Sequence, residues 1–274
     1  MKRLILLLSI TAQVIFSQNK FEIFPDDLLI RPFTANIIEP KLGFLFQVGD
    51  NELRLDIGNS IDVARYSISE NEKVSFGADL FTYTLLRGET DFHFPVDAVD
   101  YLFGINAGYK NVNKNFEYGA RLRLSHISAH FVDGHYSHET QSWRDGRNPR
   151  VYSREFLELM PYISWNDLRV YMGFTYLINV TPDELGKDIY QIGFDYFADD
   201  LIGEYFTPFI AYDFKLANLT EYTGNNSLNA GIKFGKANGK GLSIYFHYYS
   251  GKSIHGEYYD YSKQYTAIGI NLDL

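Results

Sequence analysis

The chain contains no cysteine and carries a deficit of basic residues. Without cysteine there is no disulfide framework, no thiolate metal site, no cysteine nucleophile and no lipidated N-terminal cysteine. The 25 Lys and Arg residues face 34 Asp and Glu, which gives a formal net charge of −9. An acidic chain has no electrostatic support for a nucleic-acid partner. These absences therefore argue against thiol chemistry and nucleic-acid binding as functions.

Long apolar runs are missing beyond the first residues of the chain. Two basic residues precede an apolar stretch over 4–16, and Ser17 is a small residue suited to cleavage before Gln18. This stretch is shorter than the ~20 residues that a spanning helix needs. We therefore expect residues 1–17 to be a signal peptide.

Proline is also scarce, with 8 residues, but three of them fall close together near the N-terminus. Pro25, Pro32 and Pro40 argue against a long helix or a central strand in this segment. We expect residues 18–40 to form an extended strap or plug ahead of the first main strand.

The chain is rich in strand-forming aromatic residues, and from residue 41 onward it alternates. It has 22 Tyr and 22 Phe, both of which favour strands. About twelve segments of roughly ten residues place apolar side chains on one face and Gly or charged residues on the other, as in transmembrane barrels. A soluble β-sandwich also alternates, but a charged, Gly-rich face suits a polar lumen better than a packed core. The sequence predicts an all-β fold, a transmembrane antiparallel β-barrel of about 12 strands over 41–274.

The polar face of these alternating segments carries charges of both signs. We expect these charges to lie inside the barrel, because the apolar face would meet lipid. In a barrel this narrow such charges tend to pair across the lumen, which favours a plugged interior or a tight pore without clear ion selectivity. No cofactor is expected. The lumen-facing set includes Arg54, Asp56, Asp79, Arg123, Glu158, Arg169, Asp195, Asp213 and Lys215.

Connection lengths predict the topology of the barrel. Short connections such as 111–115 and 236–240 suit the periplasmic side, and longer ones such as 132–150 suit the outside. The segment 59–72 breaks this rule, since it reads as a long periplasmic connection.

Motifs spread over most of the chain resemble an uncharacterised family of bacterial outer-membrane barrel proteins, grouped under a domain of unknown function. They include His126-x-Ser-x-His130 and Tyr152-Ser-Arg-Glu-Phe-x-Glu-Leu159. The resemblance implies a barrel in the cell outer membrane of a Gram-negative bacterium and implies no activity. In that setting the partners would be outer-membrane lipids and possible envelope proteins.

Residues 121–131 are expected to form one strand, and the direction in which its polar side chains point bears on a catalytic role. If its leucines face lipid, then His126 and Ser128 face lipid too, because alternate residues share a face. A symmetric outer loop would place Arg123 opposite Glu158, and His126 beside Glu155. A β-bulge near Ser125 would instead turn the polar residues into the lumen.

If these residues face lipid in this register, Ser128, His126 and Glu155 would be a nucleophile, its base and the group that orients the base. This arrangement looks like the His-x-Ser pattern of outer-membrane phospholipase A and of lipid A deacylase, whose sites face the membrane. The other interpretation is that these polar residues simply meet headgroups or water at the rim.

Four histidines near this strand also raise the possibility of a metal, because zinc needs three or four converging ligands. Solvated loop histidines are the simpler explanation, so no metal site is assigned. The histidines are His126, His130, His135 and His138.

Two functions remain open at this stage, and enzymatic activity is uncertain. The first is a non-enzymatic outer-membrane barrel, either a narrow pore or a structural envelope component. The second is a membrane-facing serine acyl hydrolase that acts on phospholipid or lipid A.

Overall fold

A computed structural model describes residues 20–203 and 205–274, so the expected signal peptide lies outside the described residues. No helix in these two ranges is long and apolar enough to cross a membrane. In chain order the elements are β1 (Phe21–Ile23), β2 (Leu42–Gln47), β3 (Glu52–Ser67), β4 (Glu72–Arg87), η1 (Thr90–Phe92), β5 (Val96–Val112), β6 (Glu117–Phe131), η2 (Asp133–His135), β7 (Tyr136–Ser137), β8 (Ser142–Trp143), η3 (Arg144–Gly146), β9 (Tyr152–Trp165), β10 (Leu168–Thr181), β11 (Asp188–Phe197), β12 (Phe206–Asn218), β13 (Tyr222–Phe234), β14 (Gly241–Lys252), η4 (Gly256–Tyr258) and β15 (Ser262–Asp273).

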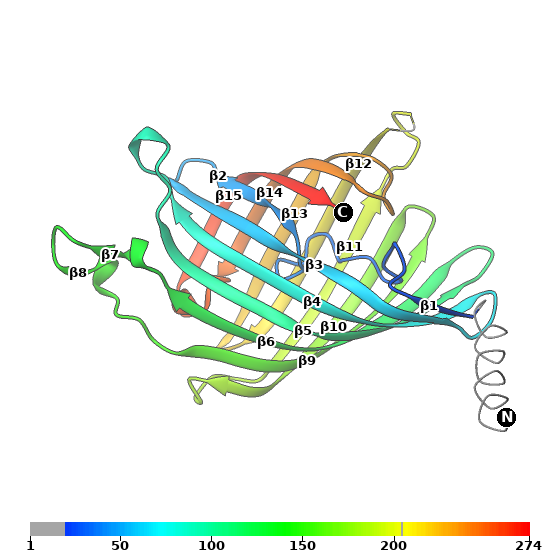
Figure 1. The fold of residues 1–274 in the computed structure, drawn as a ribbon, viewed down its shortest axis with the longest axis horizontal. Coiled ribbons are helices and arrows are strands. Elements are labelled where there is room, and N and C mark those ends of the chain that lie inside the picture. The colour runs from blue at the N-terminus through cyan, green and yellow to red at the C-terminus, as the bar shows by residue number, and fades with distance from the viewer. Residues whose placement is uncertain (1–19, 204) are drawn as a thin grey trace, which may run out of the picture.

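Twelve of the described strands close into an antiparallel barrel, which confirms the predicted fold class (Figure 1). The ring runs from β2 through β15 down to β9, then through β6, β5 and β4 to β3, which pairs with β2 again. Closure leaves few free backbone edges, which is the condition for crossing a bilayer with strands.

The predicted long connection over 59–72 is wrong, because β3 continues to Ser67 and β4 begins at Glu72. A register shift between Asp62 and Ala64 marks a β-bulge in β3. The extra residue of a bulge reverses the alternation beyond it. The periodic pattern therefore breaks at this point although the strand does not.

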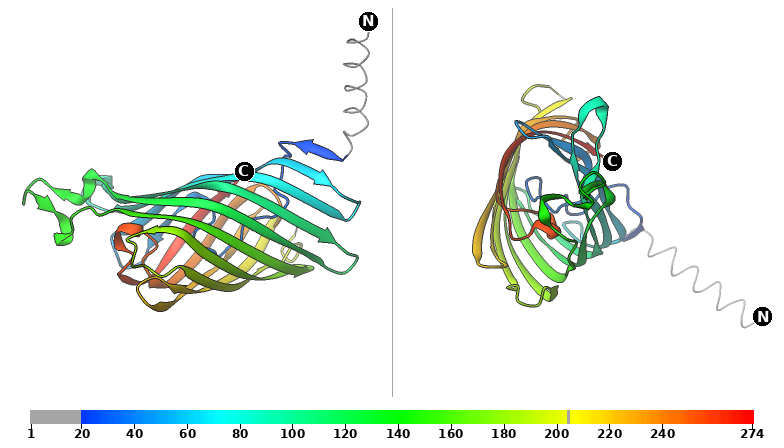
Figure 2. Two further views of the ribbon diagram at one scale, coloured as in Figure 1. Left: turned by 90° about the horizontal axis from the view of Figure 1, so that it is seen from below. Right: turned by 90° about the vertical axis from the view of Figure 1, so that its left-hand side faces the viewer.

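The N-terminal segment enters the barrel and fills the middle of its lumen. β1 pairs with the end of β3, and the chain then runs inside the ring before it joins β2, as the right view of Figure 2 shows. Phe33, Ala35, Asn36 and Glu39 are completely buried there. We call residues 24–41 the plug segment.

The connection between β14 and β15 covers the end of the lumen that carries the long loops. Asp100 of β5 is fully buried and bonds to His255 Nδ1 and to the backbone N–H of Gly256, each at 2.8 Å. Glu257 accepts hydrogen bonds from the backbone N–H groups of Phe131 and Arg150. Burial raises the pKa of the Glu257 carboxyl, and these hydrogen bonds partly offset that effect. The carboxylates of Asp100 and Glu257 thus hold this connection, residues 253–261, over the mouth of the barrel, and we call it the loop cover.

Candidate active site

The strand pair β6–β9 has the register that the sequence predicts. Arg123 lies opposite Glu158, His126 opposite Glu155, and Ser128 opposite Ser153. The connecting loop over 132–151 folds as a lateral extension with its own two-stranded ladder, β7–β8, at the left of Figure 1. The symmetric pairing places the candidate residues of the two strands side by side.

His126 and Ser128 lie on the outer face of the barrel wall. Leu122 and Leu124 precede them on that face and are 42% and 43% exposed. The alternate positions are buried in the lumen, where Arg123 and Ser125 are at most 4% exposed. The β6–β5 pairing runs without a register shift along the strand, so no bulge there rotates the histidine and serine inward.

His126 and Glu155 form a hydrogen-bonded pair across β6 and β9. The imidazole Nδ1 lies 2.6 Å from Glu155 Oε1, and both side chains are partly exposed. The ring of Phe103, directly opposite on β5, packs against the imidazole at a centroid distance of 4.9 Å. A carboxylate on Nδ1 favours the tautomer with the proton on that nitrogen, which leaves Nε2 free to accept a proton.

Ser128 lies two residues beyond His126 on the same face, about 7 Å further along the strand. Its hydroxyl forms no hydrogen bond within the described ranges of the chain, so it is available to a substrate. Tyr101 and Ser153 flank it on β5 and β9. The serine and Nε2 thus lie on one open surface. In unliganded sites the hydrogen bond between nucleophile and base is often long.

This surface lies where the outer face of the barrel changes from apolar to polar. Along β6 and β9 the outward residues pass from Leu124 and Leu157 to His126 and Glu155. The neighbouring strands make the same change, from Leu80 to Thr82, Phe103 to Tyr101 and Ile178 to Asn179. Such a border suits the level where lipid acyl chains meet their headgroups.

The other histidines of this region do not join the site. His130 points outward beyond Ser128, whereas His135 is buried between Phe131 and Trp143 in the loop. Within 20–203 and 205–274, no three His, Asp or Glu residues converge as metal ligands would. The structure therefore gives no support to the alternative of a histidine metal site.

The predicted lumen charges line the interior of the barrel, where several of them hold the plug segment. Arg123 contacts Glu158 at 2.8 Å, as the register predicts, while Arg54 pairs with Asp56 at 2.5 Å. Arg169 binds Asp195 and also donates to the plug carbonyls of Arg31 and Pro32. The carboxylate of Asp195 accepts the backbone N–H of Thr34.

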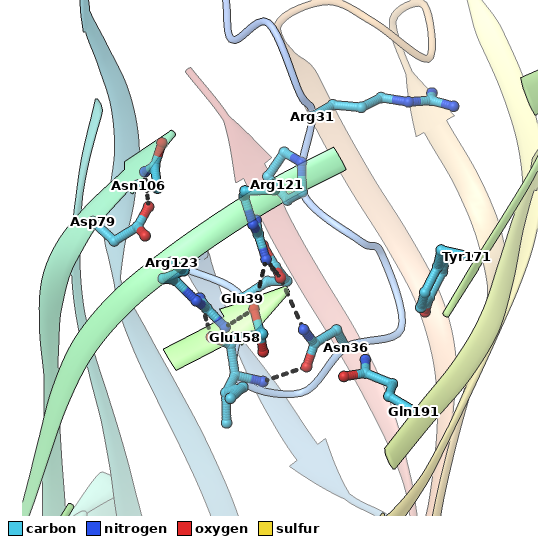
Figure 3. Close-up of polar contacts among 12 residues, drawn as sticks. Arg31, Asn36, Glu39, Asp79, Asn106, Arg121, Arg123, Glu158, Tyr171 and Gln191 are labelled. Atoms are coloured by element: carbon cyan, nitrogen blue, oxygen red, sulfur yellow. Dashed lines mark hydrogen bonds and ion pairs between the residues drawn. The ribbon is translucent and has the colours of Figure 1, made fainter. Parts of the chain in front are cut away.

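Glu39 of the plug segment is the centre of this interior network (Figure 3). Arg121 donates both terminal nitrogens to the Glu39 carboxylate, one of them at 2.7 Å, and also contacts Glu158 at 3.2 Å. Asn36 links Glu39 to Lys215 through hydrogen bonds of 2.8 and 2.6 Å. The remaining predicted residues, Asp79 and Asp213, accept hydrogen bonds from wall residues instead.

Cavities remain on both sides of the plug segment. A small one of about 80 Å³ lies toward the loop cover, with walls from Ile37 and Ile38. A larger one of about 650 Å³ lies toward the short turns, with walls from Arg31 and Lys41. The plug lies between them, so the described interior resembles a filled barrel more than an open channel.

Comparison with solved structures identifies outer-membrane barrels as similar folds. Outer membrane phospholipase A from Escherichia coli superposes with a TM-score of 0.55 at 14% identity, over 89% of this chain and 93% of that one. An active-site mutant of the same protein, with asparagine changed to alanine, gives 0.53 at 14% identity and the same coverage. The β domain of the Bordetella autotransporter BrkA gives 0.43 at 13% identity, over 85% and 97% of the two chains.

Comparison of the sequence with family models gives one match. Residues 69–274 match DUF1207, described as a protein of unknown function. The match covers every barrel strand from β4 onward, together with His126, Ser128 and Glu155. No curated protein matches the sequence.

Proposed function

Because the chain belongs to the DUF1207 family of proteins of unknown function, we propose its function from the site itself: a serine acyl hydrolase of the cell outer membrane. Its substrate is a lipid acyl ester, from phospholipid or lipid A, and its catalytic residues are Ser128, His126 and Glu155. The observation that carries this proposal is the 2.6 Å contact between His126 and Glu155 beside a serine on the same outward face.

The proposed reaction uses the nucleophile and base in two steps. Ser128 Oγ attacks the ester carbonyl while His126 Nε2 accepts its proton, and the proton then passes to the departing lipid alcohol. Water, deprotonated by the same nitrogen, next attacks the acyl-serine and releases the fatty acid. Glu155 holds the imidazole and stabilises its protonated form during both steps.

The location of the site supports a membrane lipid as substrate. Lipid acyl chains would lie on the leucines of β6 and β9, and the ester would reach Ser128 at the polar border. The similarity to a phospholipase is consistent with this choice, although at 14% identity it reports the fold alone. Ser128 faces outward, so its hydroxyl would meet membrane lipid and not a solute inside the described lumen.

A non-enzymatic role is the second candidate function. The plug segment and the loop cover favour a structural envelope component over a diffusion pore, because they occupy the described lumen. Outer-membrane lipids, with possible envelope proteins, would be the partners in either case. The two candidates differ in whether lipid is deacylated.

Removing the carboxylate of Glu155 tests the role proposed for it. Glu155→Ala is expected to lower kcat about 10²-fold or more, because His126 loses the group that fixes its tautomer. Glu155→Gln should give a kcat between those of the parent and Glu155→Ala, because the amide oxygen can still accept the proton on Nδ1 but no longer carries the charge that stabilises the protonated imidazole. Both are measured as fatty-acid release from detergent–phospholipid micelles across a pH series.

The matched control is Asn179→Ala, which changes the residue opposite Glu155 on β10 and on the same face. It should leave kcat unchanged. Equal rates in Glu155→Ala and Asn179→Ala would remove Glu155 from the mechanism.

A further inference from the structure

The larger interior cavity has a surplus of positive charge although the whole chain is acidic. It measures about 650 Å³ and lies between the plug segment and the short turns. Three of its acidic residues are already paired with basic side chains. These ion pairs are Asp273–Lys233, Glu117–Lys110 and Asp27–Arg65.

Several cations of the same cavity remain without a carboxylate. Lys41 donates only to a backbone carbonyl, that of Thr34. Lys114 and Lys240 form no ion pair within the described ranges, but both are exposed. Asp26 is the remaining acidic residue of the wall, and it is exposed. When the exposed residues of both signs are set aside, Lys41 and Arg31 are the wall charges left without an ion pair, and both are positive.

Among these unpaired cations, Arg31 is the best candidate for binding an anion. Its backbone carbonyl binds Arg169, but its own guanidinium has no acceptor anywhere in 20–203 or 205–274. The terminal nitrogen Nη1 is buried and without a partner, and the group packs over the ring of Phe197 at 5.1 Å. In Figure 3 the side chain extends away from the Glu39 network.

An arginine in this state is costly for the protein. A guanidinium offers five N–H donors in a planar fork. Arg31 is partly buried, and leaving its buried Nη1 donor without an acceptor is unfavourable. Burial and the neighbouring Arg169 lower the pKa of Arg31 to about 10, against smaller opposing effects of Asp195, Glu117 and Asp199. The side chain still carries its charge near neutral pH, so an anion in the cavity would relieve a real penalty.

The cavity extends from the short turns to an interval of β3 that has no strand partner on its β2 side, which we call the seam. β2 pairs with β3 only as far as Ile57, and β1 takes up the pairing again at Ala64. Gly58 and Asn59 from this interval line the cavity, together with Leu274 at the end of the chain. We take the turn end, which faces water, and the seam, which faces lipid, as the two routes by which a ligand would reach Arg31.

We propose that this cavity binds a phosphate group, with Arg31 as the principal ligand and Lys41 as a supporting cation. A phosphate matches the fork of arginine with two parallel hydrogen bonds, and its second charge uses the surplus of the lysines. The phosphate belongs either to a soluble anion or to a lipid headgroup that enters at the seam. This inference is independent of the proposed hydrolase, because the site lies inside the lumen.

The test compares the full-length protein with Arg31→Gln and Arg31→Lys in a phosphate-free detergent. Calorimetric titration with inorganic phosphate probes the soluble anion, and native mass spectrometry after reconstitution with phosphatidylglycerol counts retained lipid. In the probe that binds, Arg31→Gln should weaken affinity about tenfold or more. Arg31→Lys should give an intermediate loss, because it keeps the charge and loses the fork.

The matched control is Arg144→Gln, which removes an arginine from the loop at the opposite end of the barrel. It should bind as the parent does. Heat-modifiable migration on gels shows that each variant is folded. Equal binding of both probes by parent, Arg31→Gln and Arg31→Lys, or no binding of either probe by the parent, would overturn the proposal.

Discussion

Ser128→Ala is expected to abolish the release of fatty acids from outer-membrane lipid, with a loss of about 10³-fold or more in kcat/KM. The variant removes the only atom that forms the acyl intermediate, whereas the barrel loses a single outward hydroxyl at a partly exposed position. Folding should therefore be unaffected. The measurement is mass spectrometry of lipids in outer-membrane vesicles that contain either protein.

Ser153→Ala provides the control for this variant. Ser153 lies directly opposite Ser128 on β9 and faces the same way, so it shares the same lipid environment. It should keep full activity. If parent and Ser128→Ala vesicles have the same lipid profile without deacylated species, the hydrolase is refuted and the structural role becomes the better account.

Glu39→Gln is expected to release the plug segment from the barrel wall. The change leaves Arg121 and Arg123 sharing one carboxylate, that of Glu158, in a fully buried network. Breaking a buried ion pair by removing one partner typically costs about 3–5 kcal/mol. Hydrogen exchange of plug amides should then accelerate by about 10²- to 4,000-fold, since 1.4 kcal/mol corresponds to a factor of ten.

Glu52→Gln is the matched comparison for the plug. Glu52 pairs with Lys263 at 2.9 Å, but both side chains are about one-third exposed. A partly solvated pair of this kind contributes about 0–1 kcal/mol. Exchange of the plug amides should not change in this variant. Similar exchange in the two variants would mean that the Glu39 network does not hold the plug.

The barrel and its facings were predictable from the sequence because lipid and lumen impose opposite demands on alternate residues. Leu122 and Arg123 cannot exchange faces without placing a charge in lipid, so the pattern identifies both the strand and its orientation. The predicted pairing of His126 with Glu155 followed from the same constraint applied to two strands.

The sequence did not predict the features that break the regular alternation or lie outside it. The bulge at Asp62 breaks the alternation within one strand, so β3 reads as ending early. Glu39 and Arg31 lie in an irregular segment, and the wall residues around them come from strands far along the chain. The prolines of that segment argued against regular structure there, but nothing in it signalled which wall residues it would meet.

Covalent labelling tests the central claim most directly. An alkyl fluorophosphonate loses fluoride to a serine that its histidine has activated, and it leaves a phosphonyl group on the attacking oxygen. We predict that the folded protein in detergent acquires this mass on Ser128, within the tryptic peptide 124–144, and that His126→Ala does not. A folded parent protein that stays unlabelled, or that is labelled on another serine of this peptide such as Ser125, would contradict the assignment of Ser128 as a nucleophile.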